Sequence, residues 1–303
     1  MPSRPLSPAL RTRAFTVRDG SATGLSKARM GGADLARPTY AVRTVTPPVT
    51  LTDLARATSV GLPADCAFSH ATAAAVLGLP LPRELERGPL HVMRATHRPR
   101  IRRAGCEPHK GLESRDVVRV QGLSVTAPAE TWCDLAETLA LDDLIVLGDA
   151  VARRAGDVRP LAEAVARRSR PRGAGRMRHA LGLVRSGSDS AMETRSRLIF
   201  VRAGLPEPEL NAAIRDENGE WLATSDFVWR AHRVIGEYQG EVHFGDFERG
   251  DSDICRRLLI EDHDWKYLEI TRHDVFRAGR RHLMLARLVR LLGVDPLGPL
   301  SGR

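Results

Sequence analysis

A tight hairpin turn constrains the fold of the C-terminal third of this chain more than any other feature. Asp216-Glu217-Asn218-Gly219 combines residue types that favour a short β-turn between two strands. Strand-forming runs flank this turn, and they are Glu209 to Arg215, Trp221 to Thr224, Asp226 to Trp229 and Val234 to Tyr238. The sequence therefore predicts an antiparallel sheet around the hairpin.

Helices are expected on both sides of these strands. Ser190 to Phe200 has the spacing of an amphipathic helix, with Ser190 as its cap and Glu193 at the capping-box position. Beyond the sheet, the pattern predicts a helix from about Phe247 to Glu261, a strand from Lys266 to Thr271 and a helix from Val275 to Leu292. Residues 188–292 thus have the order αβββαβα, an α/β arrangement in a chain that is α+β overall.

This order places acidic residues close together. Asp226 lies just inside one strand and Glu237 near the end of the next, while Glu193 can face them from the preceding helix. Such a cluster is costly unless a cation neutralises it, and carboxylate ligands suit Mg²⁺ or Mn²⁺. Gln239 follows Glu237 by two residues and shares its face of the strand. The alternative is a structural role, in which Asp226 and Glu237 pair with Arg233 or Arg256.

The same residues carry a family resemblance. Asp226, the strand Glu237-Tyr238-Gln239-Gly240, His243 and the strand Trp265 to Thr271 resemble the core of PD-(D/E)XK nucleases. More narrowly, they are similar to domains related to very-short-patch-repair endonucleases. The resemblance implies a restriction-endonuclease-like fold and Mg²⁺-dependent or Mn²⁺-dependent hydrolysis of DNA.

The resemblance also implies roles for individual residues. The catalytic set would be Asp226, Glu237, Gln239 and His243, with Glu193, Asp226 and Glu237 as metal ligands and Arg256 and Arg257 on the phosphates. Gln239 stands where the family has lysine or aspartate, and an amide can orient water but cannot act as a base. A non-catalytic DNA-binding regulator with a degenerate nuclease fold is therefore the alternative.

Residues 1–48 form a basic segment in which arginine and lysine outnumber acidic residues. A short helix is expected to begin at Phe15, a second one after the cap Ser26, and a strand at Tyr40 to Val42. This order fits a degenerate winged helix with Lys27 and Arg29 nearest the DNA, but a disordered basic arm explains the same composition. The sequence leaves both interpretations open.

Residues 49–155 predict a mixed α/β region. The expected helices are Ser69 to Gly78, Pro128 to Ala136 and Leu141 to Val151, and the expected strands are Leu90 to Arg94 and Val117 to Val120. Through Ser69 to Leu81, Val125 to Ala136 and Leu147 to Ala150, this region resembles antitoxin-like regulators of bacterial abortive-infection systems, which implies DNA binding. His70, at the first helical position, is expected to be a capping or surface residue rather than a catalytic one.

An arginine-rich segment, residues 156–187, follows and predicts a basic helix and a hinge. Together with arginines just before it, this segment favours a phosphate-contacting stripe slightly over a solvated linker. Residues 293–303 are expected to be a tail.

Charge and composition bound the remaining choices. Lys plus Arg number 46 against 37 Asp plus Glu, a net charge of +9 that favours a polyanionic partner such as DNA, although base composition of a GC-rich genome offers another explanation. We expect no membrane span and a cytoplasmic location, because no segment approaches ~20 apolar residues. The widely separated Cys66, Cys106, Cys133 and Cys255 predict neither a disulfide framework nor structural zinc.

Overall fold

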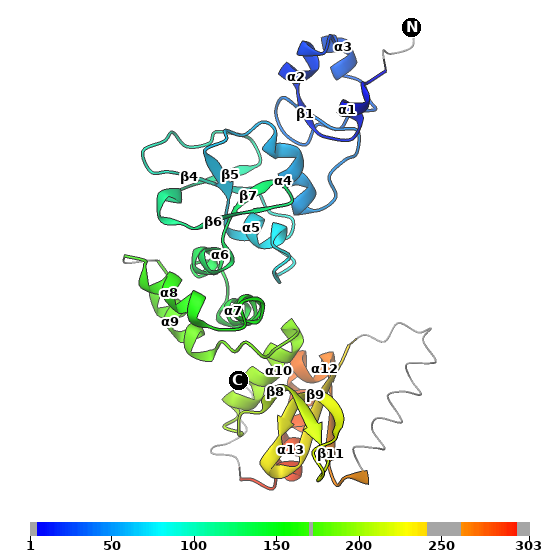
Figure 1. Cartoon of the computed structure of the whole chain (residues 1–303), viewed down its shortest axis with the longest axis vertical. Coiled ribbons are helices and arrows are strands. Elements are labelled where there is room, and N and C mark those ends of the chain that lie inside the picture. The colour runs from blue at the N-terminus through cyan, green and yellow to red at the C-terminus, as the bar shows by residue number, and fades with distance from the viewer. Residues whose placement is uncertain (1–4, 170–171, 241–261, 296–303) are drawn as a thin grey trace. The chain divides into compact units, whose positions relative to one another are not determined.

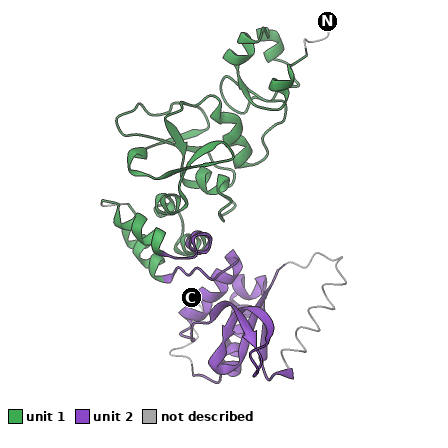
Figure 2. Cartoon of the chain, in the orientation of Figure 1, with its two compact units in different colours: residues 1–147, 159–182 green, residues 148–158, 183–303 purple. Residues whose placement is uncertain are grey.

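The structure is a computed structural model, and it describes residues 5–169, 172–240 and 262–295 (Figure 1). The chain divides into two compact units (Figure 2). The first unit comprises residues 1–147 and 159–182, and the second comprises residues 148–158 and 183–303. Helices and strands occur in both units, so the mixed α and β composition expected from the sequence is confirmed.

The N-terminal part of the first unit is a small folded structure. Its elements are α1 (Pro8–Arg11), β1 (Phe15–Thr16), α2 (Val17–Ala22), α3 (Lys27–Met30) and β2 (Val42–Arg43). Strands β1 and β2 pair in antiparallel fashion, and Phe15 and Met30 are buried in a shared apolar cluster. The described part of this segment is therefore a packed structure rather than an extended arm.

Three local expectations in this part have different outcomes. Ser26 caps α3 by accepting the backbone N–H of Arg29, as expected. The helix expected at Phe15 begins only at Val17, because Thr16 and Asp19 form a capping box that places the preceding residues in a strand. The expected strand at Tyr40 is likewise shifted to β2, after Ala41 adopts a φ of 56°.

The rest of the first unit is built on a five-stranded sheet with the order β5-β4-β3-β7-β6. The strands are β3 (Cys66–Phe68), β4 (Leu90–Arg94), β5 (Cys106–Lys110), β6 (Val117–Val120) and β7 (Leu123–Thr126). Helices α4 (Leu51–Ser59), α5 (His70–Val76) and α6 (Pro128–Leu135) and the 3₁₀ turn η1 (Leu112–Ser114) accompany the sheet. Helix α5 packs against both β4 and α6, which brings its first residue next to the sheet.

Helices α7 (Leu141–Ala155), α8 (Arg159–Ala166) and α9 (Ala174–Leu183) follow. Many arginines of this region bond protein groups rather than presenting a continuous basic stripe. Arg168 donates to Glu130 (2.8 Å) and to Asp134 (2.7 Å), and Arg176 donates to three backbone carbonyls at the end of α6 and just beyond it. Buried carboxylates therefore neutralise some of the arginines that the sequence pattern predicted to contact phosphates.

The second unit carries a four-stranded sheet with the order β11-β10-β9-β8, in which β10 and β11 are parallel and the other pairs antiparallel. Its elements are α10 (Ala191–Arg202), β8 (Glu209–Arg215), β9 (Trp221–Trp229), η2 (Arg230–His232), β10 (Val234–Gln239), β11 (Lys266–Thr271), α12 (Arg272–Phe276) and α13 (Ala278–Leu292). The helix expected at 247–261 lies outside the described residues.

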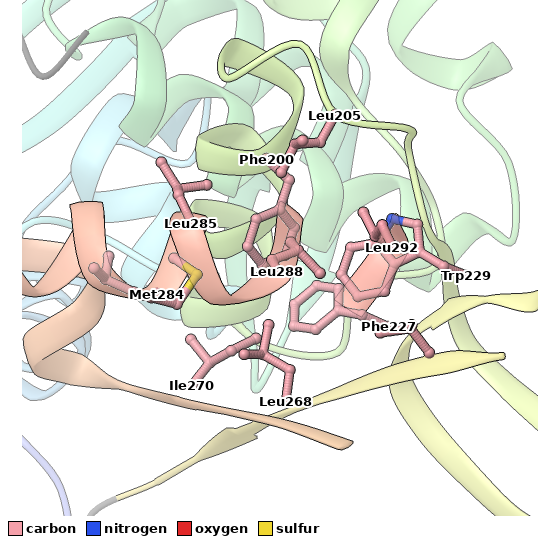
Figure 3. Packing of buried hydrophobic residues seen from close by; sticks show 12 residues of the cluster. Phe200, Leu205, Phe227, Trp229, Leu268, Ile270, Met284, Leu285, Leu288 and Leu292 are labelled. Atoms are coloured by element: carbon pink, nitrogen blue, oxygen red, sulfur yellow. The ribbon is translucent and has the colours of Figure 1, made fainter. Parts of the chain in front are cut away.

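One face of this sheet is covered by helices. In Figure 3, Leu288 of α13, Phe200 of α10 and Phe227 of β9 turn toward one another in a buried cluster. The helix expected from Val275 is instead two helices, because a capping box of Thr271 and Asp274 starts α12 earlier and Arg277 leaves the helical conformation. No helix within residues 5–169, 172–240 and 262–295 has the length and apolar character required to span a membrane.

Candidate functional site

The predicted pair Asp226 and Glu237 comes together through strand register. Phe227 pairs with Gly236 in the antiparallel β9–β10 ladder, so the next position along sets Asp226 against Glu237. The Oδ2 atom of Asp226 accepts the backbone N–H of Tyr238 at 2.7 Å, which ties the two strands together at this point. The expected neighbourhood of these two carboxylates is therefore present.

A third carboxylate, which the sequence patterns did not single out, extends this pair. Glu237 pairs with Glu269 in the parallel β10–β11 ladder. We call Asp226, Glu237 and Glu269 the acidic row, because they occupy successive positions across three neighbouring strands. Directly opposed side chains lie on one face of a sheet and within interaction distance, so like charges there oppose one another.

The acidic row and Gln239 share the face of the sheet that α10 and α13 do not cover. Val228, Ile235 and Tyr267 form a second, smaller apolar cluster on this face, and strand alternation puts residues two positions away on the same side. The Nε2 atom of Gln239 donates to the Tyr267 hydroxyl at 3.4 Å, in agreement with this placement. Asp226 and Glu237 are partly buried and Glu269 is exposed, so solvent reaches the row.

Glu193 occupies a different position from the one expected. It is 6% exposed near the start of α10, and its Oε2 atom accepts the backbone N–H of Asp189 (2.7 Å) and the Asn211 Nδ2 (2.8 Å). Asn211 lies on β8 between two residues whose partners on β9 flank Asp226, so it stands opposite Asp226 with a φ of 45°. The side-chain amide of Asn211 thus links Glu193 to β8, the strand that pairs with β9 beside Asp226.

The three carboxylates expected to share a metal do not gather by themselves. Within residues 5–169, 172–240 and 262–295, Glu193, Asp226 and Glu237 are not a set whose ligand atoms all lie within 4.8 Å of one another. The guanidinium of Arg233 donates to the backbone carbonyl of His263 at 2.7 Å. His243, Arg256 and Arg257 lie outside the described residues.

The two basic residues predicted to contact DNA in the N-terminal part differ from each other. Lys27 is exposed on α3. Arg29 is 9% exposed, and its two terminal nitrogens donate to the carboxylate of Asp34 at 2.9 and 2.7 Å. These hydrogen bonds lower the pKa of Asp34 and hold the Arg29 side chain within the N-terminal fold.

The sequence patterns also missed a group of three histidines in the first unit. His70 begins α5, His91 lies on β4 and His109 on β5, and we call them the histidine cluster. Their ligand nitrogens all lie within 4.8 Å of one another, which no other His, Cys, Asp or Glu set of three or more among the described residues achieves. No local spacing signals this cluster, since its members are far apart in the chain.

The environment of the histidine cluster lowers the pKa of all three rings. Burial and the neighbouring His109 and His91 lower the pKa of His70 to about 2, and burial also lowers the pKa of His91 and His109. The three rings are stacked, with interplanar angles of 18 to 20°. His70 is therefore part of a side-chain cluster, whereas the sequence favoured a capping or surface role.

Comparison with known proteins identifies two relatives. The uncharacterized proteins MT2308 and Rv2248 of Mycobacterium tuberculosis, from strains CDC 1551 / Oshkosh and ATCC 25618 / H37Rv, are each 33% identical to this chain over 190 residues. The matched segment covers 62% of this chain and 68% of each relative. No protein-family model matches the chain. No solved structure matches it either.

Proposed function

We propose that this chain, which belongs to the same protein family as the two M. tuberculosis proteins, is a cytoplasmic, metal-dependent DNA endonuclease with its site at the acidic row. The observation that carries the proposal is the placement of Asp226, Glu237 and Glu269 at successive positions across β9, β10 and β11. Carboxylates on neighbouring strands of one sheet face interact with one another, and their oxygens are ligands that a divalent cation prefers.

The row supplies the residue types that a hard divalent cation prefers, while its three carboxylates, all on described residues, are not all within 4.8 Å of one another in the structure. Carboxylate oxygens are the ligands that Mg²⁺ and Mn²⁺ prefer, and exposure of Glu269 leaves access for water and a phosphate. Asp226 and Glu237 would hold the ion, and Glu193 would act only through Asn211, which it bonds on the strand next to Asp226. A bound Mg²⁺ or Mn²⁺ would polarise the scissile phosphate and lower the pKa of an attacking water.

In hydrolysis the attacking water gives up a proton to solvent as its oxygen bonds to phosphorus, the bond from phosphorus to the leaving sugar oxygen breaks, and that oxygen takes up a proton. Gln239 would orient the water through its amide, because an amide cannot accept the water's proton at neutral pH. His243 would carry a proton to the leaving oxygen, and Arg256 and Arg257 would neutralise phosphate charge. Lys27 would contact the DNA backbone, with Arg29 supporting the helix that carries it.

Nicking of supercoiled plasmid tests this function. The full-length protein is incubated with Mg²⁺ or Mn²⁺ and, in parallel, with EDTA. We expect cation-dependent nicking that falls at least about 100-fold in Glu237→Gln, because the variant loses charge that stabilises the ion and the transition state.

Glu217→Gln is the matched control, since it makes the same change at an exposed position of the hairpin turn in the same unit. Nicking in this control should equal that of the wild type. Equal nicking by wild type and Glu237→Gln, or nicking that persists in EDTA, would reject the endonuclease proposal.

A second function, a non-catalytic DNA-binding regulator, is favoured by one specific observation. Gln239 holds the Tyr267 hydroxyl and supplies neither charge nor a base at the position where related nucleases carry lysine or aspartate. In this function, the N-terminal fold with its exposed Lys27 would bind DNA and the acidic row would be inactive.

The salt dependence of DNA binding distinguishes a DNA-binding regulator from a protein that does not bind DNA. Affinity should fall steeply between ~50 and ~200 mM salt, and Lys27→Gln should reduce the slope by about 1 through the loss of one phosphate contact. Arg83→Gln, an exposed basic residue elsewhere in the first unit, serves as control. Salt-insensitive or absent binding counts against both functions.

A further inference from the structure

We propose that the histidine cluster of the first unit binds a divalent transition-metal ion of the Zn²⁺ type through three imidazole nitrogens. This site is separate from the acidic row and does not depend on the endonuclease proposal. The cysteine and histidine spacing in the sequence predicts no structural zinc site. The three ligands proposed here come from distant parts of the chain, so local spacing does not reveal them.

Backbone hydrogen bonds fix the first two members of the cluster relative to each other. The backbone N–H of Ser69, just before α5, donates to the carbonyl of His91 at 3.0 Å. The N–H of His91 in turn donates to the Thr72 hydroxyl at 2.8 Å. Both the N–H and the carbonyl group of His91 therefore bond to the start of α5. At this point His70 adopts a φ of 49°. A left-handed conformation at a residue other than glycine is costly and is concentrated at functional sites.

Strand register supplies the third member. His91 pairs with Glu107 and Met93 pairs with His109 in the parallel β4–β5 ladder. His91 and His109 are thus diagonal neighbours on one face of the sheet. The Nδ1 atom of His91 lies 2.9 Å from the Nε2 atom of His109. The ring of His70 stacks on that of His109, with the two centroids 3.8 Å apart.

These distances are close to those of a metal site. Three imidazoles bound to a tetrahedral ion at about 2.0–2.1 Å have nitrogens roughly 3.3 Å apart. The ligand nitrogens of the cluster all lie within 4.8 Å of one another, which is near this spacing. Imidazole ligands suit Zn²⁺, Cu²⁺, Ni²⁺ and Fe²⁺, whereas Mg²⁺ and Ca²⁺ prefer oxygen ligands that this set lacks.

A neighbouring hydroxyl assigns the ligand atom of His70. The Nδ1 atom of His70 lies 3.0 Å from the Ser69 hydroxyl. Metal-binding histidines regularly bond an oxygen with the nitrogen that does not bind the ion, which fixes the orientation of the ring. His70 would therefore bind through Nε2, held in place by Ser69.

A cavity gives the cluster access to solvent. His70 and His109 line a pocket of about 480 Å³ within the first unit, together with Lys110, Arg115, Asp134 and Arg168. Arg115 and Arg168 donate to Asp134 at 3.1 and 2.7 Å, which orders this wall of the pocket. An ion can enter by this route, and solvent from the pocket would complete its coordination, as at sites with three histidine ligands.

Titration with Zn²⁺ and Co²⁺ tests the proposal on the full-length protein after treatment with a chelator. Excess Mg²⁺ is kept in the buffer to saturate oxygen-ligand sites such as the acidic row. Calorimetry should show one equivalent of Zn²⁺, and Co²⁺ should give the visible absorption of a tetrahedral site. His109→Gln and His91→Gln should each weaken Zn²⁺ binding at least about 100-fold, because each removes a ligand.

His179→Gln is the control, since His179 is an exposed histidine on α9 of the same unit. Circular dichroism checks that each variant is folded. If both ligand variants fail to fold, thermal unfolding of the wild type decides, because an ion bound only by the native state raises the unfolding temperature. Absence of a stoichiometric Zn²⁺ site in the wild type, or unchanged binding in folded His109→Gln and His91→Gln, overturns the proposal.

Discussion

The two units of this chain assemble their reactive side chains in different ways. The acidic row of the second unit comes from three strands that are neighbours in one sheet, and each member faces the next through strand register. The histidine cluster of the first unit needs two strands and the first residue of a helix that packs onto them. Strand register is enough to bring together residues that already lie on neighbouring strands. A contact between a helix and a sheet cannot be predicted from the local sequence pattern.

Both units contain buried ion pairs. In the second unit, Arg197 and Asp149 are almost fully buried, and Arg197 donates to Asp149 at 2.9 Å. In the first unit, Arg168 bonds the buried Glu130 and Asp134. Burial raises the pKa of Asp149, and the Arg197 charge opposes that change. Ion pairs of this kind organise each unit internally, and in the first unit the Arg168–Asp134 pair also lines the pocket beside the histidine cluster.

The largest expected effect tests whether the two units are independent. Arg197→Met leaves Asp149 buried without its charged partner, which should lower the free energy of unfolding of the second unit by about 3–5 kcal/mol. Urea unfolding followed by tryptophan fluorescence measures this change. Zn²⁺ binding at the histidine cluster should remain as in the wild type if the first unit folds independently.

Arg202→Met is the control, because Arg202 is exposed at the end of the same helix α10. It should alter stability by less than about 1 kcal/mol. Loss of Zn²⁺ binding in Arg197→Met would show that the two units depend on each other.

A gain of function would sharpen the interpretation of the acidic row. Gln239→Lys places a cation on the same face as Glu237, where it can stabilise negative charge on the phosphate. We expect plasmid nicking to rise about 10- to 100-fold, a change of roughly 1.4 to 2.8 kcal/mol in the activation free energy. Gln239→Met, with a side chain of similar length and no charge, should show no increase. Equal rates in both variants would mean that position 239 does not face the reacting phosphate.

The smallest expected effect concerns the fastening of the histidine cluster. Thr72 is fully buried and accepts the backbone N–H of His91, so Thr72→Val removes the acceptor while preserving shape. An unpaired buried N–H costs on the order of 1 kcal/mol, and we expect Zn²⁺ affinity to fall up to about tenfold. Thr72→Ser, which keeps the hydroxyl, should restore most of the affinity. Identical Zn²⁺ affinities in Thr72→Val and wild type would show that this bond does not position His91.

Much of the second unit was predictable because its signals are local. The hairpin turn, the cap Ser190 and the alternation around Glu237 act over a few residues, and the corresponding elements α10, β8, β9 and β10 are present. Glu269 also lay within a predicted strand, but its role depends on the pairing of β11 with β10, which no local pattern states.

The first unit was harder to predict for physical reasons that individual strands illustrate. Strand β5 contains Pro108, which is tolerated because β5 is an edge strand of the sheet, and this proline obscured the strand pattern. Strand β3 has only three residues and gives too short a pattern to recognise. Without β5, the sequence could not show that His91 and His109 are neighbours.

The sequence by itself determined the local structure of this protein: the capped helices, the hairpin turn, and the strands that carry Asp226 and Glu237. Only the tertiary structure decided the partners of the charged and metal-binding side chains. It directed Arg168 to Glu130 and Asp134, and His70 to two distant histidines. The physical reason is range, because caps and turns are satisfied within a few residues, whereas a buried charge or a ligand set is completed by segments that meet only when the chain packs.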